Sequence, residues 1–240
     1  MRINREAFLF AILLGVTAIA AAQAGKTPPS QTLNATPSSA PAEALLNGSA
    51  LWDQVPARRI SLNRTPPLYD TDEPASLEIP VLDVRVARAS GKVLVQMSWA
   101  DPTPDAAVLP EVPNTPPETR FRKLPTEADD RFFDAVAVMF PAKPGAMTPS
   151  LQMGGTDDPV QIYYWSAARG PMLMDATGRG TTRRTGASFA AHGAYEKGRW
   201  TVALELPDLP AGTPLAFAIW NGSQKDRDGR KYFSVWQELQ

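Results

Sequence analysis

Two segments of the chain place a potential metal-binding side chain beside an apolar, strand-like run. Residues 150–165 read SLQMGGTDDPVQIYYW and contain the thioether of Met153. Residues 217–236 read FAIWNGSQKDRDGRKYFSVW and contain the amines of Lys225 and Lys231. A soft sulfur ligand together with a neutral amine suits haem iron better than zinc or calcium. A lone methionine is more often a packing residue and a lone lysine a surface residue, so spacing alone does not identify either as a ligand.

Other kinds of catalytic or metal site find little support in the sequence. The chain has no cysteine and a single histidine, His192, in a glycine-flanked stretch that reads as a solvated turn. This disfavours nucleophilic catalysis by a Ser-His-Asp triad and a zinc site alike. The acidic stretches TDDP and DRDG do not match the calcium loop of EF-hands, so we interpret them as ordinary turns. The stretch GRGTTRRTG lacks the Lys-Ser/Thr ending of a phosphate-binding loop.

The first residues have the pattern of a secretory signal peptide. Two arginines precede an apolar run over residues 8–22, and an Ala-Gln-Ala cleavage site ends at Ala24. The run is short for a bilayer span of about 20 residues, so we expect cleavage after Ala24 rather than an uncleaved anchor. The mature protein is therefore expected outside the cytoplasm, without stable membrane insertion.

The composition of the remaining chain indicates one exported globular domain. Without cysteine there are no disulfides, so its stability must come from a hydrophobic core. The full chain has a net charge of −1, which becomes −2 when Arg2, Arg5 and Glu6 leave with the signal, so there is no basic field for nucleic acid. We therefore divide the chain into a signal peptide at 1–24, a flexible linker rich in Pro, Ser and Thr at 25–43, and a folded domain at 44–240.

Alternation of apolar and polar residues with a period of two dominates the folded domain. Residues 82–90 and 92–99 alternate around a Ser-Gly turn, which predicts a β-hairpin. Residues 102–125 predict a long surface insertion, and residues 167–195 predict loop with some irregular helix. A short helical turn is predicted within 44–52, and further strands at 132–141, 159–165, 198–207, 214–222 and 231–239. About seven or eight strands with turn-rich connections favour an all-β fold, an antiparallel β-sandwich.

Several of these segments, taken together and in order, resemble a known family. They are ALWDQVP at 50–56, FFDAVAVMFP at 132–141, MGGTDDPVQIYYW at 153–165, GRWTVALELPDL at 198–209 and the segment 217–236. The chain resembles the haem-binding γ subunits of the ethylbenzene dehydrogenase family, which includes those of dimethyl sulfide dehydrogenase, selenate reductase and chlorate reductase. The insertion 102–125 departs from the family pattern and leaves the partner surface undefined.

The resemblance implies a β-sandwich whose long loops enclose one non-covalently bound haem b. It places the axial ligands of the iron at Met153 and Lys231, with Lys225 as the alternative lysine. Gly154 and Gly155 would let the backbone pass close to the flat ring. A lysine binds iron only as the neutral amine, so the site must favour deprotonation of a group whose ordinary pKa is about 10.4. Trp165, Trp220, Phe233 and Trp236 could supply apolar walls or belong to the core.

The resemblance also implies a periplasmic electron-transfer subunit that is not itself an enzyme. Its family partners are a molybdopterin catalytic subunit and an iron–sulfur subunit, with a soluble c-type cytochrome as electron partner. Two other classes stay open: a secreted carbohydrate-binding β-sandwich that uses exposed aromatic residues, and a haem-free docking subunit. Neither has a use for Met153 or Lys231, and both predict a colourless protein. The substrate of the parent complex and the direction of electron flow are not encoded in these segments.

Overall fold

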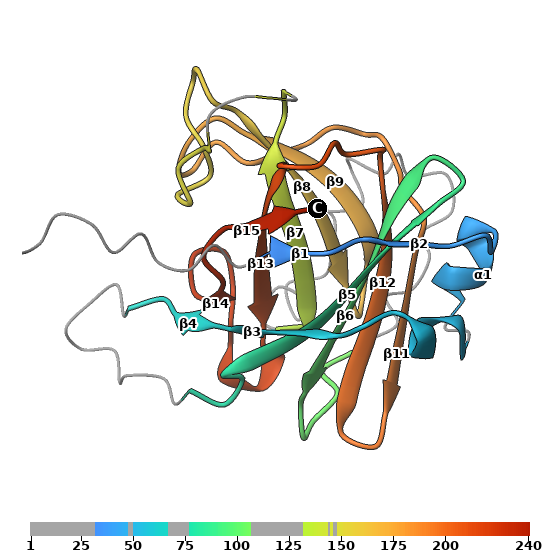
Figure 1. The fold of residues 1–240 in the computed structure, drawn as a ribbon. Coiled ribbons are helices and arrows are strands. Elements are labelled where there is room, and N and C mark those ends of the chain that lie inside the picture. Colours follow the sequence, from blue (N-terminus) through green and yellow to red (C-terminus); the bar gives the residue numbers. More distant parts are fainter. Residues whose placement is uncertain (1–31, 48–49, 67–76, 107–131, 144, 146–147) are drawn as a thin grey trace, which may run out of the picture. The chain divides into compact units, whose positions relative to one another are not determined.

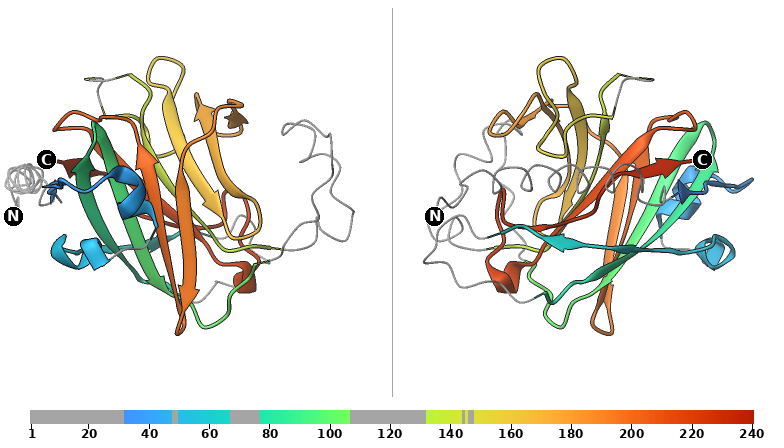
Figure 2. Two further views of the ribbon diagram at one scale, coloured as in Figure 1. Left: turned by 90° about the vertical axis from the view of Figure 1, so that its right-hand side faces the viewer. Right: turned by 60° about the vertical axis from the view of Figure 1, so that its left-hand side comes forward.

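The computed structural model describes residues 32–47, 50–66, 77–106, 132–143, 145 and 148–240, which form two β-sheets packed face to face (Figures 1 and 2). The predicted signal peptide and residues 107–125 of the predicted insertion lie outside this part of the chain. None of the helices that the structure describes is long and apolar enough to cross a bilayer. The all-β sandwich predicted from the sequence is confirmed.

The larger sheet has nine strands and the smaller sheet has six. In spatial order, the larger sheet contains β1 (Thr32–Leu33), β15 (Gln237–Leu239), β13 (Pro214–Trp220), β7 (Ala135–Pro141), β8 (Val160–Ser166), β9 (Gly170–Ala176) and β10 (Arg183–Arg184), with β14 (Tyr232–Phe233) paired to β13 and β4 (Asn63–Arg64) paired to β14. The smaller sheet contains β11 (Ala191–Glu196), β12 (Arg199–Leu206), β6 (Lys92–Ala100), β5 (Val81–Ala89) and β2 (Thr36–Pro37), with β3 (Arg58–Ser61) also paired to β5. The described residues also form three short helices, α1 (Ala42–Leu46), η1 (Ala50–Gln54) and η2 (Gly222–Gln224).

The predicted hairpin is the pair β5–β6. Its strands close at Ala89 opposite Lys92. The two turn residues between them, Ser90 and Gly91, have φ angles of 53° and 69°. Two successive positive φ values are those of a type I′ turn, whose twist matches that of the strands it connects. The local sequence therefore fixes the register of this hairpin, and with it the face that each strand buries.

Strand β7 buries both of its faces. Val136, Val138 and Phe140 point into the core between the sheets. Ala137 and Met139 point the other way and belong to a separate apolar cluster on the outer face of the larger sheet. All residues of β7 are buried, as expected for a strand that is covered on two sides. The larger sheet therefore carries apolar residues on the face that in a simple sandwich would be solvated.

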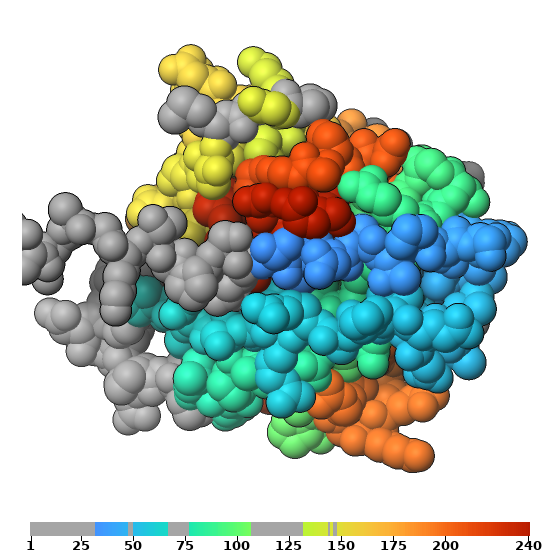
Figure 3. Space-filling model, in the orientation of Figure 1, coloured from blue at the N-terminus to red at the C-terminus, as the bar shows by residue number. Residues whose placement is uncertain are grey.

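The N-terminal residues of the described chain are part of the sandwich, which corrects residues 32–43 of the linker predicted at 25–43; residues 25–31 lie outside the described part. Thr32 pairs with Glu238 in β15, and Thr36 pairs with Ala87 in β5. Figure 3 shows this blue segment lying against the red C-terminal strand. The side chain of Leu33 is 1% exposed and anchors the segment in the core. Both pairings are parallel, so the two sheets are mixed rather than wholly antiparallel.

Residues 167–195, predicted as loop with irregular helix, contain strands β9, β10 and β11. Gly, Thr and Arg are tolerated here because β10 and β11 end their sheets, where one side of the strand has no partner to match. His192 lies in β11 opposite Ala203 and is exposed, so it is a strand residue rather than a turn residue.

Candidate functional site

An apolar cluster on the outer face of the larger sheet, called here the outer cluster, brings the two sequence-predicted segments together. Its buried members are Ala137, Met139, Val160, Ile162, Ala176 and Ala216, and the partly buried side chains packed against them are Leu151, Met153, Tyr164, Met174, Trp220 and Trp236. The small residues Ala137 and Ala216 lie on the central strands β7 and β13. Burial against this cluster raises the pKa of Tyr164 to about 12.

Met153 reaches the outer cluster from the loop between β7 and β8. Its φ angle is 75°, a left-handed conformation that is uncommon for a residue with a side chain and costs about 1 kcal/mol or more. Two hydrogen bonds hold the loop in place: the N–H of Gly178 donates to the carbonyl of Met153 at 2.8 Å, and the N–H of Gly154 donates to the carbonyl of Ser150 at 2.9 Å. Strained residues of this kind concentrate at functional sites, and this one directs a thioether to an apolar surface.

Gly154 and Gly155 are required by the turn that follows Met153. A Cβ at Gly154, where φ is +69°, would lie 2.4 Å from the carbonyl oxygen of Asp158 and 3.1 Å from Val160 Cγ1. A Cβ at Gly155 would lie 2.4 Å from Asp158 Oδ1. The Asp158 carboxylate also accepts a hydrogen bond from the Ser150 N–H at 3.2 Å. The glycines therefore allow the loop to fold onto Asp158, and this fixes the position of the preceding residue, Met153.

Lys231 approaches the outer cluster from the segment between η2 and β14. Its ammonium nitrogen lies 5.2 Å from the centroid of the Trp220 ring, and Trp220 in turn contacts Tyr164 edge-on at 5.2 Å between ring centroids. Burial lowers the pKa of Lys231, and the nearby carboxylate of Asp228 opposes that shift. Lys231 and Met153 thus contact the same apolar cluster, through Trp220 in the case of Lys231.

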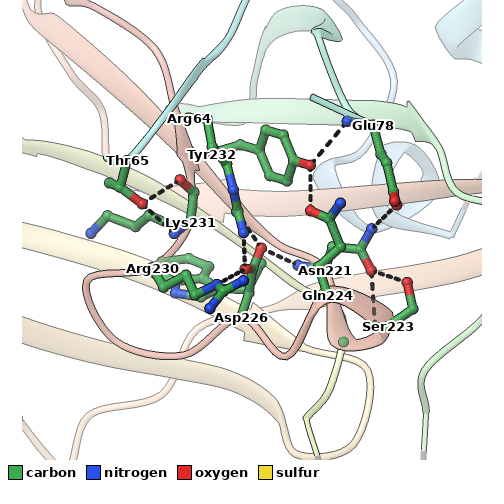
Figure 4. Close-up of polar contacts among 12 residues, drawn as sticks. Arg64, Thr65, Glu78, Asn221, Ser223, Gln224, Asp226, Arg230, Lys231 and Tyr232 are labelled. Atoms are coloured by element: carbon green, nitrogen blue, oxygen red, sulfur yellow. Dashed lines mark hydrogen bonds and ion pairs between the residues drawn. The ribbon is translucent and has the colours of Figure 1, made fainter. Parts of the chain in front are cut away.

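The backbone of Lys231 is fixed by Thr65, next to β4 (Figure 4). The N–H of Lys231 donates to Thr65 Oγ1 at 2.9 Å, and the N–H of Thr65 donates to the carbonyl of Lys231 at 3.0 Å. Lys225 is placed differently: it is exposed, has a φ angle of 55°, and caps η2 by donating its N–H to the carbonyl of Gly222 at 2.9 Å.

A buried ion pair beneath Lys231 was not predicted from the sequence. Arg64 donates from Nη1 to Asp226 Oδ2 at 2.7 Å, and its guanidinium lies 4.4 Å from the centroid of the Tyr232 ring. Asp226 also accepts the N–H of Asn221 at 3.0 Å (Figure 4). Asp226 belongs to the stretch DRDG that we interpreted as a plain acidic turn. Its partner Arg64 lies 162 residues away in sequence, so no local pattern could have identified the pair.

Asp134 forms a second buried polar centre at the start of β7. Its carboxylate accepts three hydrogen bonds, from the N–H of Gly222 at 2.9 Å, the N–H of Asp105 at 2.7 Å and the indole N–H of Trp200 at 2.9 Å. Through Gly222 it anchors η2, which precedes the Lys231 segment. Burial and then the charge of Asp134 raise the pKa of the neighbouring Asp101 to about 7, and burial also raises the pKa of Asp134.

This acid pair predicts that the folded state loses stability as pH rises. Between about pH 4, where a free aspartate titrates, and about pH 7, the folded protein binds more protons at Asp101 than the unfolded chain does. The free energy of unfolding therefore falls with rising pH across this range, by up to about 4 kcal/mol. Urea unfolding at successive pH values measures the slope. Asp101→Asn, which mimics the protonated acid, should flatten it, whereas the exposed control Asp208→Asn should not; equal slopes in Asp101→Asn and wild type would contradict the assignment.

Comparison with known proteins identifies the family of this chain. Residues 49–186 match the family model described as ethylbenzene dehydrogenase. The chain is 32% identical over 200 residues to the putative respiratory nitrate reductase heme subunit ORF7 of Haloferax mediterranei, a match that covers 78% of this chain and spans 65% of the length of that relative. It is 26% identical to the dimethylsulfide dehydrogenase subunit gamma of Rhodovulum sulfidophilum, covering 77% of this chain and 70% of that protein. It is 24% identical to the chlorate reductase subunit gamma of Ideonella dechloratans, covering 95% and 93%.

Among solved structures, a carbohydrate binding module of family 9 from Caldicellulosiruptor kristjanssonii, in complex with cellotriose, aligns with a TM-score of 0.41 at 10% identity. That alignment covers 88% of this chain and 93% of the module. The family match spans more than half of the chain and includes β7, β8, β9 and the Met153 loop, that is, most of the surface that forms the outer cluster. On this match, the chain belongs to the ethylbenzene dehydrogenase family.

Proposed function

We propose that this protein binds one haem b without covalent bonds and carries electrons within an oxidoreductase complex, without being catalytic itself. The observation that carries the proposal is the meeting of Met153 and Lys231 at one apolar cluster on the outer face of the larger sheet. Two of the relatives are named as gamma subunits and one as a heme subunit. None of these names describes a catalytic subunit.

The donor set of the outer cluster fits haem iron. Met153 offers a neutral thioether, and the buried surroundings of Lys231 favour the neutral amine that a metal requires. Ala137 of β7 and Ala216 of β13 contribute small side chains to the same cluster. When bound there, haem supplies a one-electron redox centre. Because Met153 and Lys231 would both hold the haem iron, this chain would offer no free iron position to a substrate.

Lys231 is the better candidate for the amine ligand than Lys225. Lys231 is half-buried, its pKa is lowered by burial, and its amine already lies over Trp220. Lys225 is exposed and has its backbone committed to capping η2. The two lysines lie in the same short loop, so the sequence alone does not distinguish them. Their burial and contacts in the fold do.

The partners proposed for this subunit rest on the family resemblance, and the subunit names of its relatives support membership of a larger complex. A nitrate reductase, a dimethylsulfide dehydrogenase and a chlorate reductase each contribute one of the relatives described above. By analogy, the present chain would join a molybdopterin catalytic subunit and an iron–sulfur subunit, and exchange electrons with a soluble c-type cytochrome. The signal peptide expected at 1–24 supports a periplasmic location.

Carbohydrate binding receives less support from the side chains. That function needs exposed aromatic rings as stacking platforms, but Tyr163 and Trp165 are only 8% and 7% exposed and belong to the core between the sheets. Trp165 stacks edge-on with Trp200 at 5.4 Å between ring centroids. Trp220 and Trp236 pack against the outer cluster. A haem-free docking subunit would have the same fold but would bind no haem, so haem content distinguishes it from the proposed subunit.

Haem content of the exported, purified protein tests the proposal. Protein produced with ample haem should carry one haem per chain, released intact by acid and organic solvent because no cysteine binds it. Protein that is folded, as judged by circular dichroism, but binds no haem under these conditions would contradict the proposal. The haem-free docking subunit would then be the remaining interpretation.

Gly154→Ala should weaken haem binding without unfolding the protein. The added Cβ would collide with the Asp158 carbonyl and shift the turn that positions Met153. We expect about tenfold weaker haem binding, equivalent to about 1.4 kcal/mol. Gly91→Ala is a matched control, because Gly91 has the same φ of +69° but nothing within 4 Å of the added Cβ. Haem titration of both variants makes the comparison; equal losses of affinity would indicate a general backbone effect and contradict the role of the turn.

A further inference from the structure

The outer face of the smaller sheet is divided into a covered apolar half and an open polar half. Helices α1 and η1 cover the apolar half, where Leu45, Leu46, Trp52 and Val55 pack on Ala87, Ala89, Leu94 and Ala203. The polar half forms a groove of about 510 Å³, called here the arginine groove, which is lined by Ala57, Arg59, Asp83, Arg85, Ser98 and Arg199.

The strand register places the groove residues in a row across four strands. Arg59 in β3 pairs with Asp83 in β5, Asp83 pairs with Ser98 in β6, and Ser98 pairs with Thr201 in β12. Directly paired residues point to the same face of a sheet, and neighbouring strands lie about 4.8 Å apart. The row therefore spans about 14 Å, which is the length of a short extended peptide of about four residues.

Three guanidinium groups and one carboxylate give the arginine groove a positive balance. Asp83 accepts a hydrogen bond from Arg59 Nε at 2.9 Å and another from Arg199 Nη2 at 3.2 Å, and these contacts lower the pKa of Asp83. Arg85 donates to the Val55 carbonyl at 3.1 Å. The side chains of Arg59 and Arg199 remain 70% and 45% exposed. One carboxylate cannot saturate several guanidiniums with five N–H donors each, so the groove can accept further anionic oxygens.

The lining of the arginine groove selects among anionic partners. Among its lining residues, Ala57 is the single apolar one, and there is no aromatic side chain. A membrane-binding surface would add large apolar anchors, and a nucleic-acid surface would add stacking rings. The floor instead offers hydroxyl groups, from Ser98 and its neighbour Thr201, which bond to each other at 3.2 Å. Guanidinium forks above a polar, pleated floor suit the carboxylates and amides of a peptide.

We propose that the arginine groove is a docking surface for an acidic peptide segment of a protein partner. Carboxylates of the peptide bind the guanidiniums of Arg59 and Arg199, and Arg85 adds positive charge to the floor. The groove lies on the sheet opposite to the outer cluster, so a partner bound here leaves Met153 and Lys231 uncovered. The inference does not depend on haem binding.

Binding of a fluorescein-labelled hexaglutamate peptide, followed by fluorescence anisotropy at low ionic strength, tests this docking surface. Wild-type protein should bind the peptide and lose affinity as salt is added. The double substitution Arg59→Gln/Arg199→Gln should weaken binding at least tenfold, while Arg88→Gln, which removes an arginine paired with Asp208 elsewhere, should leave it unchanged. Thermal unfolding shows whether the double variant is folded. If the double variant is unfolded, the single variant Arg59→Gln, at a highly exposed position, replaces it in the binding test.

Three results would overturn the docking surface. Wild-type protein that does not bind hexaglutamate contradicts it, and so does equal affinity in wild type and the double variant. The third is retention on phosphatidylserine vesicles that depends on Arg59 and Arg199 without any peptide binding, which would reassign the groove to a membrane. The readout of this experiment is peptide affinity. A protein that binds no peptide therefore does not contradict the haem proposal, and a protein that binds no haem does not contradict the docking surface.

Discussion

Replacing Lys231 by alanine is expected to convert the bound haem from six-coordinate to five-coordinate and to lower haem affinity about 100-fold, equivalent to about 2.7 kcal/mol. The substitution removes the amine that lies over Trp220 but keeps the backbone bonds to Thr65, which involve only the main chain of residue 231. The fold should therefore survive. Absorption spectra of the ferric and ferrous protein report the coordination change, and haem titration reports the affinity.

Lys225→Asn is the matched control for Lys231→Ala. Lys225 has a left-handed backbone conformation, which asparagine tolerates better than most residues. The control therefore removes a second lysine of the same loop without disturbing η2, and it should retain the wild-type spectrum. The reverse pattern, with a normal spectrum in Lys231→Ala and a changed one in Lys225→Asn, would transfer the ligand role to Lys225.

Asp134→Ala is expected to destabilise the protein by about 3–5 kcal/mol. The change leaves three donors without their acceptor: the N–H groups of Gly222 and Asp105 and the indole N–H of Trp200. A buried donor that loses its partner costs about 1–3 kcal/mol, and a domain has only about 5–15 kcal/mol of stability in total. Urea unfolding, in which the midpoint falls while the slope stays constant, measures the loss.

The same substitution should also loosen the Lys231 segment, since Asp134 anchors η2 through Gly222. The exposed Asp157 provides a control, and Asp157→Ala should stay within about 0.5 kcal/mol of wild type. A loss of less than about 1 kcal/mol in Asp134→Ala would show that water replaces the three lost hydrogen bonds, and would contradict the structural role of this carboxylate.

Strands with strong alternation and a well-defined turn could be predicted from the sequence. The β5–β6 hairpin, β7 and β8 follow directly from their residue patterns, because local side chains decide which face is buried. The pairing of Thr32 with Glu238 could not be predicted, because it joins the two ends of the folded unit and strand β1 has only two residues. The strands within 167–195 were missed for a related reason: an edge strand tolerates residues that a central strand excludes.

The candidate site was only partly predictable. Met153 and Lys231 were proposed from the family resemblance, and the structure places both against the outer cluster. Backbone freedom at Gly154 was predicted, but the contact with Asp158 that requires a glycine there could not be, because Asp158 folds back onto it only in three dimensions. Asp134 lay inside the recognised segment 132–141, yet its partner Gly222 is distant in sequence. Long-range polar contacts that hold a binding loop leave no periodic signal in the chain.

The most direct test of ligation by Met153 and Lys231 is the absorption spectrum of the exported protein in its oxidised and dithionite-reduced forms, beside Met153→Ala. We expect a six-coordinate, low-spin b-type spectrum in both redox states of the wild type, converted to high spin in Met153→Ala. A wild-type spectrum that is already high spin, or one that Met153→Ala leaves unchanged, would contradict axial ligation by this thioether.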